Sequence, residues 1–292
     1  MKLAISGNLA KPGLRKAVGT FIRHLESVGV QYVVDHRIAA LLAGVDENVP
    51  DSHVCESAFT CPGVDMLVAF GGDGTILAAA REVGESGIPI LGVNLGKLGF
   101  LAEVTPEELS TAIRDLQGGN FRIEERLVLE ATSPSTSERV FHAVNDIVVD
   151  KSRSSRVIDL ETHIDGDYAV TYRGDGLIIS TPTGSTAYAL SNGGPIVTPA
   201  SRVIGITPIS PHTLSGRPLI VPDTSTIRVI VQSANDEVLI SVDGQTQVPL
   251  RPPIELNVHK APYPVRLVKR TDKSYFDVLR AKLHWGRNPR SR

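Results

Sequence analysis

The first 120 residues alternate short, continuous apolar runs with segments of helical periodicity. The runs KLAIS, YVVD, DMLVAF and PILGV have the length of strands, and strands that are apolar throughout are typical of parallel sheets covered on both faces. After the first run, apolar residues recur at spacings of 3 to 4 and form one stripe of a helix: Leu14, Val18, Phe21, Ile22 and Leu25. The pattern predicts an α/β domain over residues 1–120, with a parallel, Rossmann-like sheet.

The last helix of this region carries its own start and stop signals. In TPEELSTAIRDLQGG, Thr105 is the expected N-cap, Pro106 occupies the first helical position and Glu108 completes a capping box. The pair Gly118-Gly119 ends the helix.

From residue 121 the pattern changes to β-branched, often alternating segments separated by Asp-Gly, Pro and Ser-Asn turns. This predicts a mainly β domain over residues 121–269. Residues 270–292 form a helical tail, because SYFDVLRAKLHW places Tyr275, Val278, Leu279 and Leu283 on one face. That face needs a partner, and we expect the helix to pack back on the first domain.

Composition excludes several classes. No run approaches the roughly 18 apolar residues of a membrane helix, and the N-terminus lacks a signal-peptide pattern, so a cytoplasmic protein without a membrane partner is expected. A net charge of −2 argues against a nucleic-acid partner. Cys55 and Cys61 show neither CxxC spacing nor a neighbouring histidine cluster, so thiols are favoured over a disulfide framework or a zinc site.

The stretch MLVAFGGDGTILAAA aims a charge into a glycine turn. A buried strand, Met66 to Phe70, leads into Gly71, Gly72 and Gly74, and Thr75 is expected to open a helix with free N–H groups, which is a phosphate cradle. A carboxylate there repels phosphates, so Asp73 indicates contact with a hydroxyl or a metal ion and hence phosphoryl transfer to an alcohol. The alternative is that Asp73 only caps the helix or closes an Asx-turn.

A second group of polar residues follows the apolar run LIIS. Five hydroxyl residues lie within Ser180 to Thr186, before a short helical segment that GGP closes. Ser and Thr are common in turns, but this density exceeds what a connection requires, and it predicts a ligand site at the strand end.

Seven segments, in order over nearly the whole chain, resemble the NAD kinase family: GGDGT (71–75), GVNLGKLGFLAE (92–103), AVNDIVV (143–149), DGLIISTPTGSTAYALSNGGPI (175–196), PHTLSGRPLIVP (211–222), VDGQ (242–245) and YFDVLRAKLHWG (275–286). The TPTGSTAY block is the most specific. GGDGT alone is shared with lipid kinases of the diacylglycerol type, but there it usually continues as GGDGT-x-NE, which this chain does not do.

The resemblance implies transfer of the terminal phosphoryl group of ATP, or of inorganic polyphosphate, to the adenosine 2′-hydroxyl of NAD, giving NADP. Asp73 corresponds to the proton acceptor and contacts NAD together with Gly74, while Gly71, Gly72, Gly74 and Thr75 bind phosphate. A divalent cation such as Mg²⁺ is expected with ATP, although the sequence contains no dedicated metal cage. A homodimer or homotetramer is also implied.

The residues that the resemblance assigns to NAD lie in the β domain: Asn145, Asp146, Arg156, Arg173, Asp175, Thr186, Ala187, Tyr188, Ala189, Leu190, Ser191 and Gln245. Asp146 replaces the commoner Glu and shortens its reach by one methylene. Asn-Asp is also a favourable turn pair, but AVNDIVVD has a strand pattern that a turn would interrupt. For Arg156 the alternative is simple solvation. Arg173 lies two residues before Asp175, so the two face the same side of an extended segment.

Phe100 is implied to close over the adenine, with an ordinary core phenylalanine as the alternative. Two other functional classes are weighed against the kinase. A lipid kinase predicts a membrane-facing surface, and a sensing protein without catalysis would bind a dinucleotide better without the charge of Asp73.

Overall fold

The structure, a computed structural model, describes residues 1–43, 49–59, 61–97, 99–136, 139–213, 215–234 and 237–284. The chain forms two compact units, one of Met1–Glu125 with the chain from Arg266 onward, and one of Arg126–Val265. The boundaries predicted from the sequence lie after residues 120 and 269. The difference arises because strands at both boundaries belong to the sheet of the first unit.

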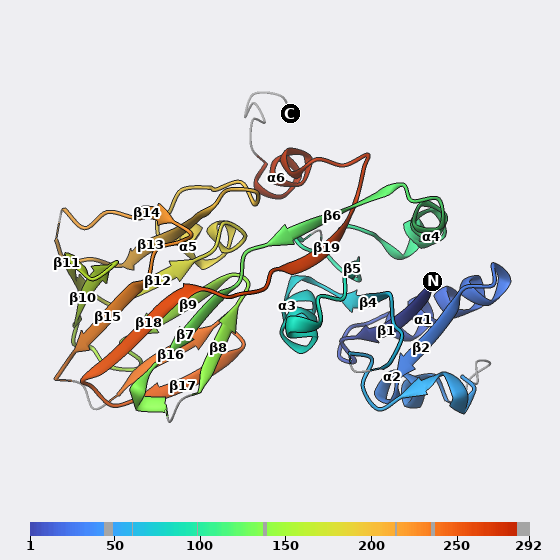
Figure 1. The fold of residues 1–292 in the computed structure, drawn as a ribbon, viewed down its shortest axis with the longest axis horizontal. Coiled ribbons are helices and arrows are strands. Elements are labelled where there is room, and N and C mark those ends of the chain that lie inside the picture. The colour runs from blue at the N-terminus through green and yellow to red at the C-terminus, as the bar shows by residue number, and fades with distance from the viewer. Residues whose placement is uncertain are drawn as a thin grey trace. The chain divides into compact units, whose positions relative to one another are not determined.

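The first unit is built on a seven-stranded sheet of order β3-β2-β1-β4-β5-β19-β6 (Figure 1). Pairs β2/β3, β1/β2, β1/β4, β4/β5 and β5/β19 are parallel, which confirms the predicted parallel sheet. The strands are β1 (Lys2–Gly7), β2 (Gln31–Asp35), β3 (Val54–Cys55), β4 (Met66–Gly71), β5 (Ile90–Asn94), β6 (Phe121–Arg126) and β19 (Val265–Arg270). The order reverses between β1 and β4, and open α/β sheets bind ligands beyond the carboxyl ends of the strands at such a point.

Helices cover both faces of this sheet. One core joins apolar residues of α1, α2 and α4 to alternate strand residues such as Val68 and Phe70, and the Phe21 and Phe70 rings lie 5.5 Å apart. The opposite face carries α3, whose Ile76 lies against Gly92 of β5. The helices are α1 (Leu14–Ser27), α2 (His36–Leu42), α3 (Asp73–Val83), α4 (Leu109–Gln117) and α6 (Tyr275–Leu283), with 3-10 turns η1 (Asp51–His53), η2 (Gly84–Ser86) and η3 (Pro106–Glu108).

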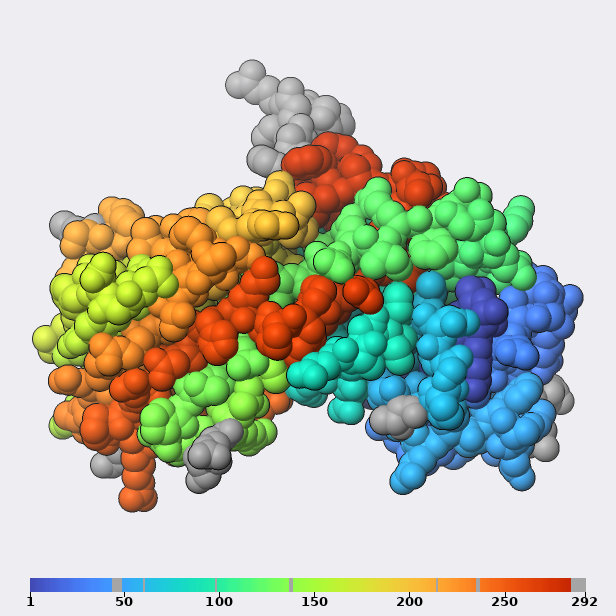
Figure 2. Space-filling model, viewed as in Figure 1, coloured from blue at the N-terminus to red at the C-terminus, as the bar shows by residue number. Residues whose placement is uncertain are grey.

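The helix ends lie at or within two residues of the predicted positions. The capping box at Thr105 and Glu108 is present, with the Thr105 N–H donating to Glu108 Oε2 at 3.0 Å. Helix α3 begins at Asp73, two residues before the expected Thr75. The expected C-terminal helix is α6, which buries Val278 and Leu279. Figure 2 shows the N-terminal residues (blue) and the segment around α4 (green) on the surface of the first unit.

The second unit is a pair of six-stranded sheets whose neighbouring strands are all antiparallel, and this confirms the predicted mainly β domain. The sheet orders are β11-β10-β15-β18-β7-β8 and β14-β13-β12-β9-β16-β17. One core takes side chains from both sheets, as in a β-sandwich. The elements are β7 (Leu129–Thr132), β8 (Val140–Ala143), β9 (Asp146–Asp150), β10 (Ile158–Ile164), β11 (Asp167–Gly174), β12 (Gly176–Ser180), β13 (Val203–Ile209), β14 (Leu219–Pro222), β15 (Ile227–Gln232), β16 (Val238–Val242), β17 (Thr246–Leu250), β18 (Ile254–Lys260) and the short helices η4 (Pro134–Thr136), η5 (Gly184–Thr186) and α5 (Tyr188–Ser191).

Two expectations about local structure are wrong. The run AVNDIVVD is not one strand, because it breaks at Val144 and Asn145, where the chain leaves β8 of one sheet and enters β9 of the other. Cys55 and Cys61 are not thiols but form a disulfide. Cys55 ends the edge strand β3, and a six-residue separation lets the chain turn back and bring the two sulfurs together. No helix among the described residues has the length and apolarity needed to cross a bilayer.

Candidate active site

The carboxylate of Asp73 is held by three consecutive backbone amides. Oδ2 accepts from Phe100 N–H at 2.8 Å, and Oδ1 accepts from Leu101 N–H at 3.0 Å and from Ala102 N–H at 3.3 Å. We call Phe100–Ala102 the amide loop. Helix α3 has Gly72 as its N-cap, and the Asp73 carboxylate instead makes a long-range contact with residues 27 to 29 positions later.

A carboxylate has about four acceptor sites, and the amide loop fills three of them. Among the described residues this leaves one site on Oδ2, with 29% of the Asp73 side chain exposed. The geometry thus fixes both oxygens and still leaves one lone pair of a positioned carboxylate for a hydroxyl.

Glycines allow the Asp73 carboxylate and the amide loop to lie this close together. A Cβ at Gly99 would lie 1.9 Å from Asp73 Oδ1, so any side chain there would displace the carboxylate or the amide loop. A Cβ at Gly71 would lie 2.0 Å from Thr75 Oγ1, which accepts from the Gly72 N–H at 3.4 Å. The predicted phosphate cradle, Gly71 to Thr75, is thus a close-packed turn at the start of α3.

A buried ion pair supports the amide loop from β19. Lys269 and Glu103 are 5% and 6% exposed, and Lys269 Nζ lies 3.6 Å from Glu103 Oε2. The same ammonium donates to the carbonyls of Phe100 at 3.4 Å and Leu101 at 3.3 Å. The peptides that donate to Asp73 are therefore held by a cation on their carbonyl side.

In the second unit, Asp243 plays an equivalent structural part. Its carboxylate accepts from the N–H groups of Val144 at 3.1 Å, Asn145 at 2.7 Å and Asp146 at 3.2 Å. Asp243 itself has φ 52°, the left-handed conformation that Asp tolerates in a turn before glycine. The VDGQ turn therefore shapes the Asn-Asp corner.

The hydroxyl-rich turn after β12 packs against the same corner. Thr181 Oγ1 donates to the Val144 carbonyl at 2.6 Å, and the Gly184 N–H donates to Thr181 Oγ1 at 3.0 Å. Ser185 Oγ bonds to Pro182 O at 2.7 Å and accepts from Val197 N–H at 3.0 Å. These buried hydroxyls thus bind backbone and build the corner, whereas the sequence analysis expected them to face a ligand.

This corner forms one side of a pocket of about 330 Å³, which we call the acidic pocket. Three carboxylates line it, those of Asp146, Asp150 and Asp243, together with Asn145 and Tyr188. Carboxylates accept hydrogen bonds from hydroxyls and amines but repel phosphates, so the acidic pocket suits the nucleoside part of a nucleotide. The remaining lining residues are Val148, Ala187, Leu239, Ser241, Gly244 and Gln247.

Burial changes the chemistry of two of these carboxyls. Burial, and then the charge of Asp243, raises the pKa of Asp146 to about 7. Burial also raises the pKa of Asp150, opposed by its bond from the Ser152 N–H and reinforced by the charge of Asp175. Near neutral pH, Asp146 therefore exists in both protonation states and can donate as well as accept a hydrogen bond.

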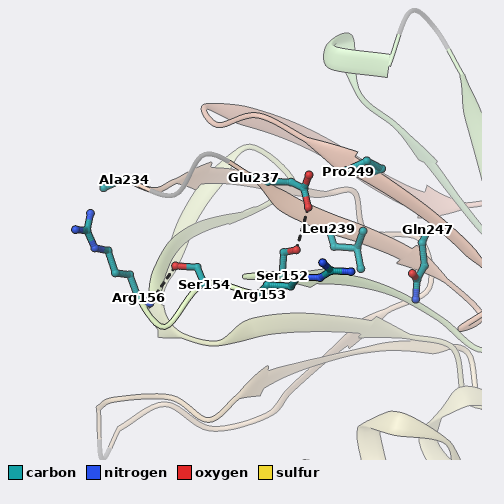
Figure 3. Close-up of a pocket in the computed structure, with 9 residues that line it drawn as sticks. All are labelled: Ser152, Arg153, Ser154, Arg156, Ala234, Glu237, Leu239, Gln247 and Pro249. Atoms are coloured by element: carbon teal, nitrogen blue, oxygen red, sulfur yellow. Dashed lines mark hydrogen bonds between the residues drawn. The ribbon is translucent and has the colours of Figure 1, made fainter.

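A larger groove adjoins the acidic pocket through the shared residues Leu239 and Gln247. It measures about 950 Å³ and brings Arg153 and Arg156 together with Glu237, whose Oε1 accepts from Ser152 Oγ at 3.0 Å (Figure 3). We call it the arginine groove. Figure 3 shows the Arg156 side chain extended away from Leu239 and Gln247.

The structure gathers only part of the predicted NAD set around the acidic pocket, namely Asn145, Asp146, Ala187 and Tyr188. Arg156 lies in the arginine groove instead. The chain bends at Asp175, which binds Lys151 Nζ at 2.7 Å, so the expected extended segment is interrupted, and Arg173 faces Asp159 at 3.7 Å.

The other predicted residues do not line either cavity. Ala189 is buried in a small core, Thr186 Oγ1 bonds to the Thr183 carbonyl at 3.2 Å, and Gln245 is exposed. Leu190 and Ser191 lie on α5 without a place in the lining.

Several residues of these sites were not predicted from the sequence. Asp243 and Glu103 lie within segments that resemble the family, VDGQ and GVNLGKLGFLAE, but no role was assigned to them. Lys269 and Asp150 are charged residues in strand-like runs, and only burial or the pocket reveals them.

The described residues offer no cage for a metal ion, since no group of three or more His, Cys, Asp or Glu is arranged to hold one among them.

An α/β unit with an aspartate fixed in a glycine turn, together with a β unit holding an acidic pocket, is the arrangement expected of a nucleotide-dependent phosphotransferase that has an alcohol as acceptor. Comparison with known proteins is more specific. Residues 29–121 match the model of the ATP-NAD kinase N-terminal domain, and residues 144–270 match that of the ATP-NAD kinase C-terminal domain.

Similar proteins cover nearly the whole chain. The NAD kinase of Moorella thermoacetica is 43% identical over 98% of this chain and 90% of its own, and that of Geobacter metallireducens is 41% identical over 98% and 99%. Among solved structures, a yeast NADH kinase complexed with NADH has a TM-score of 0.90 at 30% identity, covering 100% of this chain and 90% of its own. An NAD kinase from Archaeoglobus fulgidus in complex with ATP has a TM-score of 0.75 at 25% identity, and the match covers 97% of this chain and 99% of that one. This chain belongs to the NAD kinase family.

Proposed function

We propose that this chain transfers the terminal phosphoryl group of ATP to the 2′-hydroxyl of the adenosine ribose of NAD, with Asp73 as the proton acceptor. As a member of the NAD kinase family it is an enzyme that phosphorylates NAD. The relatives reported above give no support to the lipid-kinase alternative. The observation that carries the assignment of Asp73 is its carboxylate, fixed by three amides with one acceptor site left on Oδ2.

In this reaction the 2′-hydroxyl donates to Asp73 Oδ2 and its oxygen forms a bond to the γ-phosphorus. The bond from that phosphorus to the bridging oxygen of ADP breaks, and the hydroxyl proton ends on Asp73. Because the transition state of phosphoryl transfer is largely dissociative, proton transfer can be late and a weakly basic carboxylate is sufficient. The fixed position of the carboxylate supplies most of its contribution to the rate.

The division of charge in the second unit supports the mode of NAD binding. We infer that the adenosine of NAD lies in the acidic pocket, where Tyr188 offers an aromatic face and Asn145 and Asp146 accept from hydroxyls or the amino group. The diphosphate then lies over the adjoining arginine groove, near Arg153 and Arg156, because those cations attract the charge that the acidic pocket repels.

The first unit supplies the donor side. We propose that Gly71, Gly72, Gly74 and Thr75 bind donor phosphates through the amides at the start of α3. Mg²⁺ is proposed to arrive bound to ATP. Use of polyphosphate as a donor, a homodimer or homotetramer and a cytoplasmic location stay predictions.

The test compares wild type and Asp73→Asn in NADP formation from NAD with ATP and Mg²⁺, with polyphosphate as a second donor. Asn keeps one oxygen for the amide loop but cannot take the proton, so we expect turnover to fall by at least about 10²-fold while NAD binding is retained. Near-wild-type turnover of a pure variant would contradict the role of Asp73. Absence of NADP from every donor, with folded wild type, would contradict the proposed function.

A further inference from the structure

Helix α6 places a cation beside the open side of Asp73. Lys282 Nζ lies 4.0 Å from Asp73 Oδ2, and 5.2 Å from the centroid of the Phe100 ring. The neighbouring oxygen is Oδ2, which accepts only one amide, whereas Oδ1 accepts two. The ammonium therefore lies next to the oxygen that we assign to the reacting hydroxyl.

The position of Lys282 follows from the way in which α6 is anchored. Ser274 and Asp277 form a capping box, with Asp277 N–H donating to Ser274 Oγ at 3.2 Å and Ser274 N–H donating to Asp277 Oδ2 at 3.0 Å. Val278 and Leu279 are buried. Lys282 follows them by four and three positions, so it lies on the same side of the helix.

The pair is not a closed salt bridge. A separation of 4.0 Å exceeds hydrogen-bond length, and the two side chains are 34% and 29% exposed. A ligand can thus reach the ammonium and the carboxylate from solvent. A tightly bonded, fully buried pair would have indicated a structural role instead.

This arrangement answers an electrostatic problem in the site. Asp73 stands at the start of α3, among amides that bind phosphate, and its charge repels the donor. A cation near Oδ2 offsets that repulsion. The same cation can stabilise the negative charge on the equatorial oxygens of the phosphoryl group during its transfer from the donor to the hydroxyl.

We propose that Lys282 is a catalytic residue whose ammonium contacts the transferring phosphoryl group. The proposal rests on the proposed function. The bond changes are those given above, in which the ribose oxygen bonds to phosphorus, ADP leaves and the proton passes to Asp73. Lys282 stays protonated throughout and contributes only its charge and hydrogen bonds.

The experiment measures kcat, the KM for ATP and the equilibrium affinity for NAD in Lys282→Met, Lys282→Arg and a matched control. Arg280 is the control, because it is a cation on the same helix that pairs with Asp277. We expect Lys282→Met to lower kcat about 10- to 100-fold, with the NAD affinity and the melting temperature close to those of wild type. Lys282→Arg is expected to recover most of the loss, and Arg280→Met to stay within about twofold of wild type.

Three results would overturn the proposal. One is a kcat of Lys282→Met within about twofold of wild type. Another is an equal loss in Arg280→Met, which would show a general effect of charge on α6. The third is a loss in Lys282→Arg as large as in Lys282→Met, which would show that shape and not charge matters. All three presuppose an active wild type, so a failure of the proposed function itself is seen separately as a wild type that forms no NADP.

Discussion

Each unit of the chain contains an aspartate that binds three consecutive backbone amides, and the surroundings of the two differ in sign. Asp73 binds the amide loop and has Lys282 at 4.0 Å, with Lys269 behind the loop. Asp243 binds the Asn-Asp corner and has another carboxyl, that of Asp146, as its neighbour. The same arrangement of a carboxylate and three amides thus occurs twice, once with cations nearby and once with another carboxyl nearby.

The comparison shows that two aspartates in similar glycine-containing motifs stand in opposite electrostatic surroundings. Both aspartates stand beside glycines, in GGDGT and VDGQ. In the first unit the carboxylate projects to solvent on one side and remains available to a substrate. In the second unit Asp243 shapes the wall of a pocket and shifts the titration of its neighbour.

The largest effect is expected from removing the buried cation Lys269 behind the amide loop of the first unit. Lys269→Met leaves Glu103 buried without its partner and removes the donor to the carbonyls of Phe100 and Leu101. We expect a loss of about 3 to 5 kcal/mol in the free energy of unfolding, measured by urea denaturation. Arg266→Met is the control, because Arg266 lies on the same strand and its ion pair with Glu125 is 47% and 60% exposed, so it is expected to contribute less than about 1 kcal/mol. Equal losses in both variants would contradict the support assigned to Lys269.

The second effect tests the acidic surroundings of Asp243 through the substitution Asp146→Asn. With its pKa raised to about 7, native Asp146 keeps a proton that the unfolded chain releases above about pH 4, so the free energy of unfolding falls as pH rises until about pH 7. Asn removes that fall. Between pH 5 and pH 8.5 the variant should gain about 2 to 3 kcal/mol relative to wild type, from roughly two pH units at about 1.4 kcal/mol each.

Urea denaturation at the two pH values measures this gain. Asp159→Asn is the control, because Asp159 is on the surface and 46% exposed, and its effect should be the same at both pH values. A stability difference between Asp146→Asn and wild type that does not depend on pH would show that Asp146 is ionised in the native state.

The smallest effect is expected from a one-methyl change beside Asp73. Gly99→Ala places a Cβ where the structure has Asp73 Oδ1 at 1.9 Å, and the displaced carboxylate should lower kcat about 10- to 100-fold. Gly96→Ala, in the same segment, meets nothing within 4 Å and should stay within about twofold of wild type. Steady-state kinetics that show equal losses would mean that the carboxylate position is not what the reaction requires.

Some features were predictable because they depend on local pattern. The apolar runs of the first 120 residues predicted a parallel sheet, since strands buried on both faces are apolar throughout. The capping signals at Thr105, Glu108 and Gly118 predicted helix α4 with its turn η3. The glycine turn after the apolar run Met66 to Phe70 predicted that Asp73 lies beyond the end of a strand.

Other features depend on residues far apart in the sequence. The strand pattern of AVNDIVVD hid the break at Asn145, because the break is held by amide bonds to Asp243, 98 residues later. The pairing of Cys55 with Cys61 was also missed, since it depends on the path of the chain after an edge strand.

The sequence by itself determined the class of fold, the family and the identity of the candidate base, because strand periodicity, glycine turns and motif order are properties of short segments. Tertiary structure alone decided what surrounds that base. The amide loop comes 27 to 29 residues after Asp73, and Lys282 comes from the far end of the described chain. Electrostatic interactions act over distances in space and not along the sequence, so the charge of each site exists only after folding.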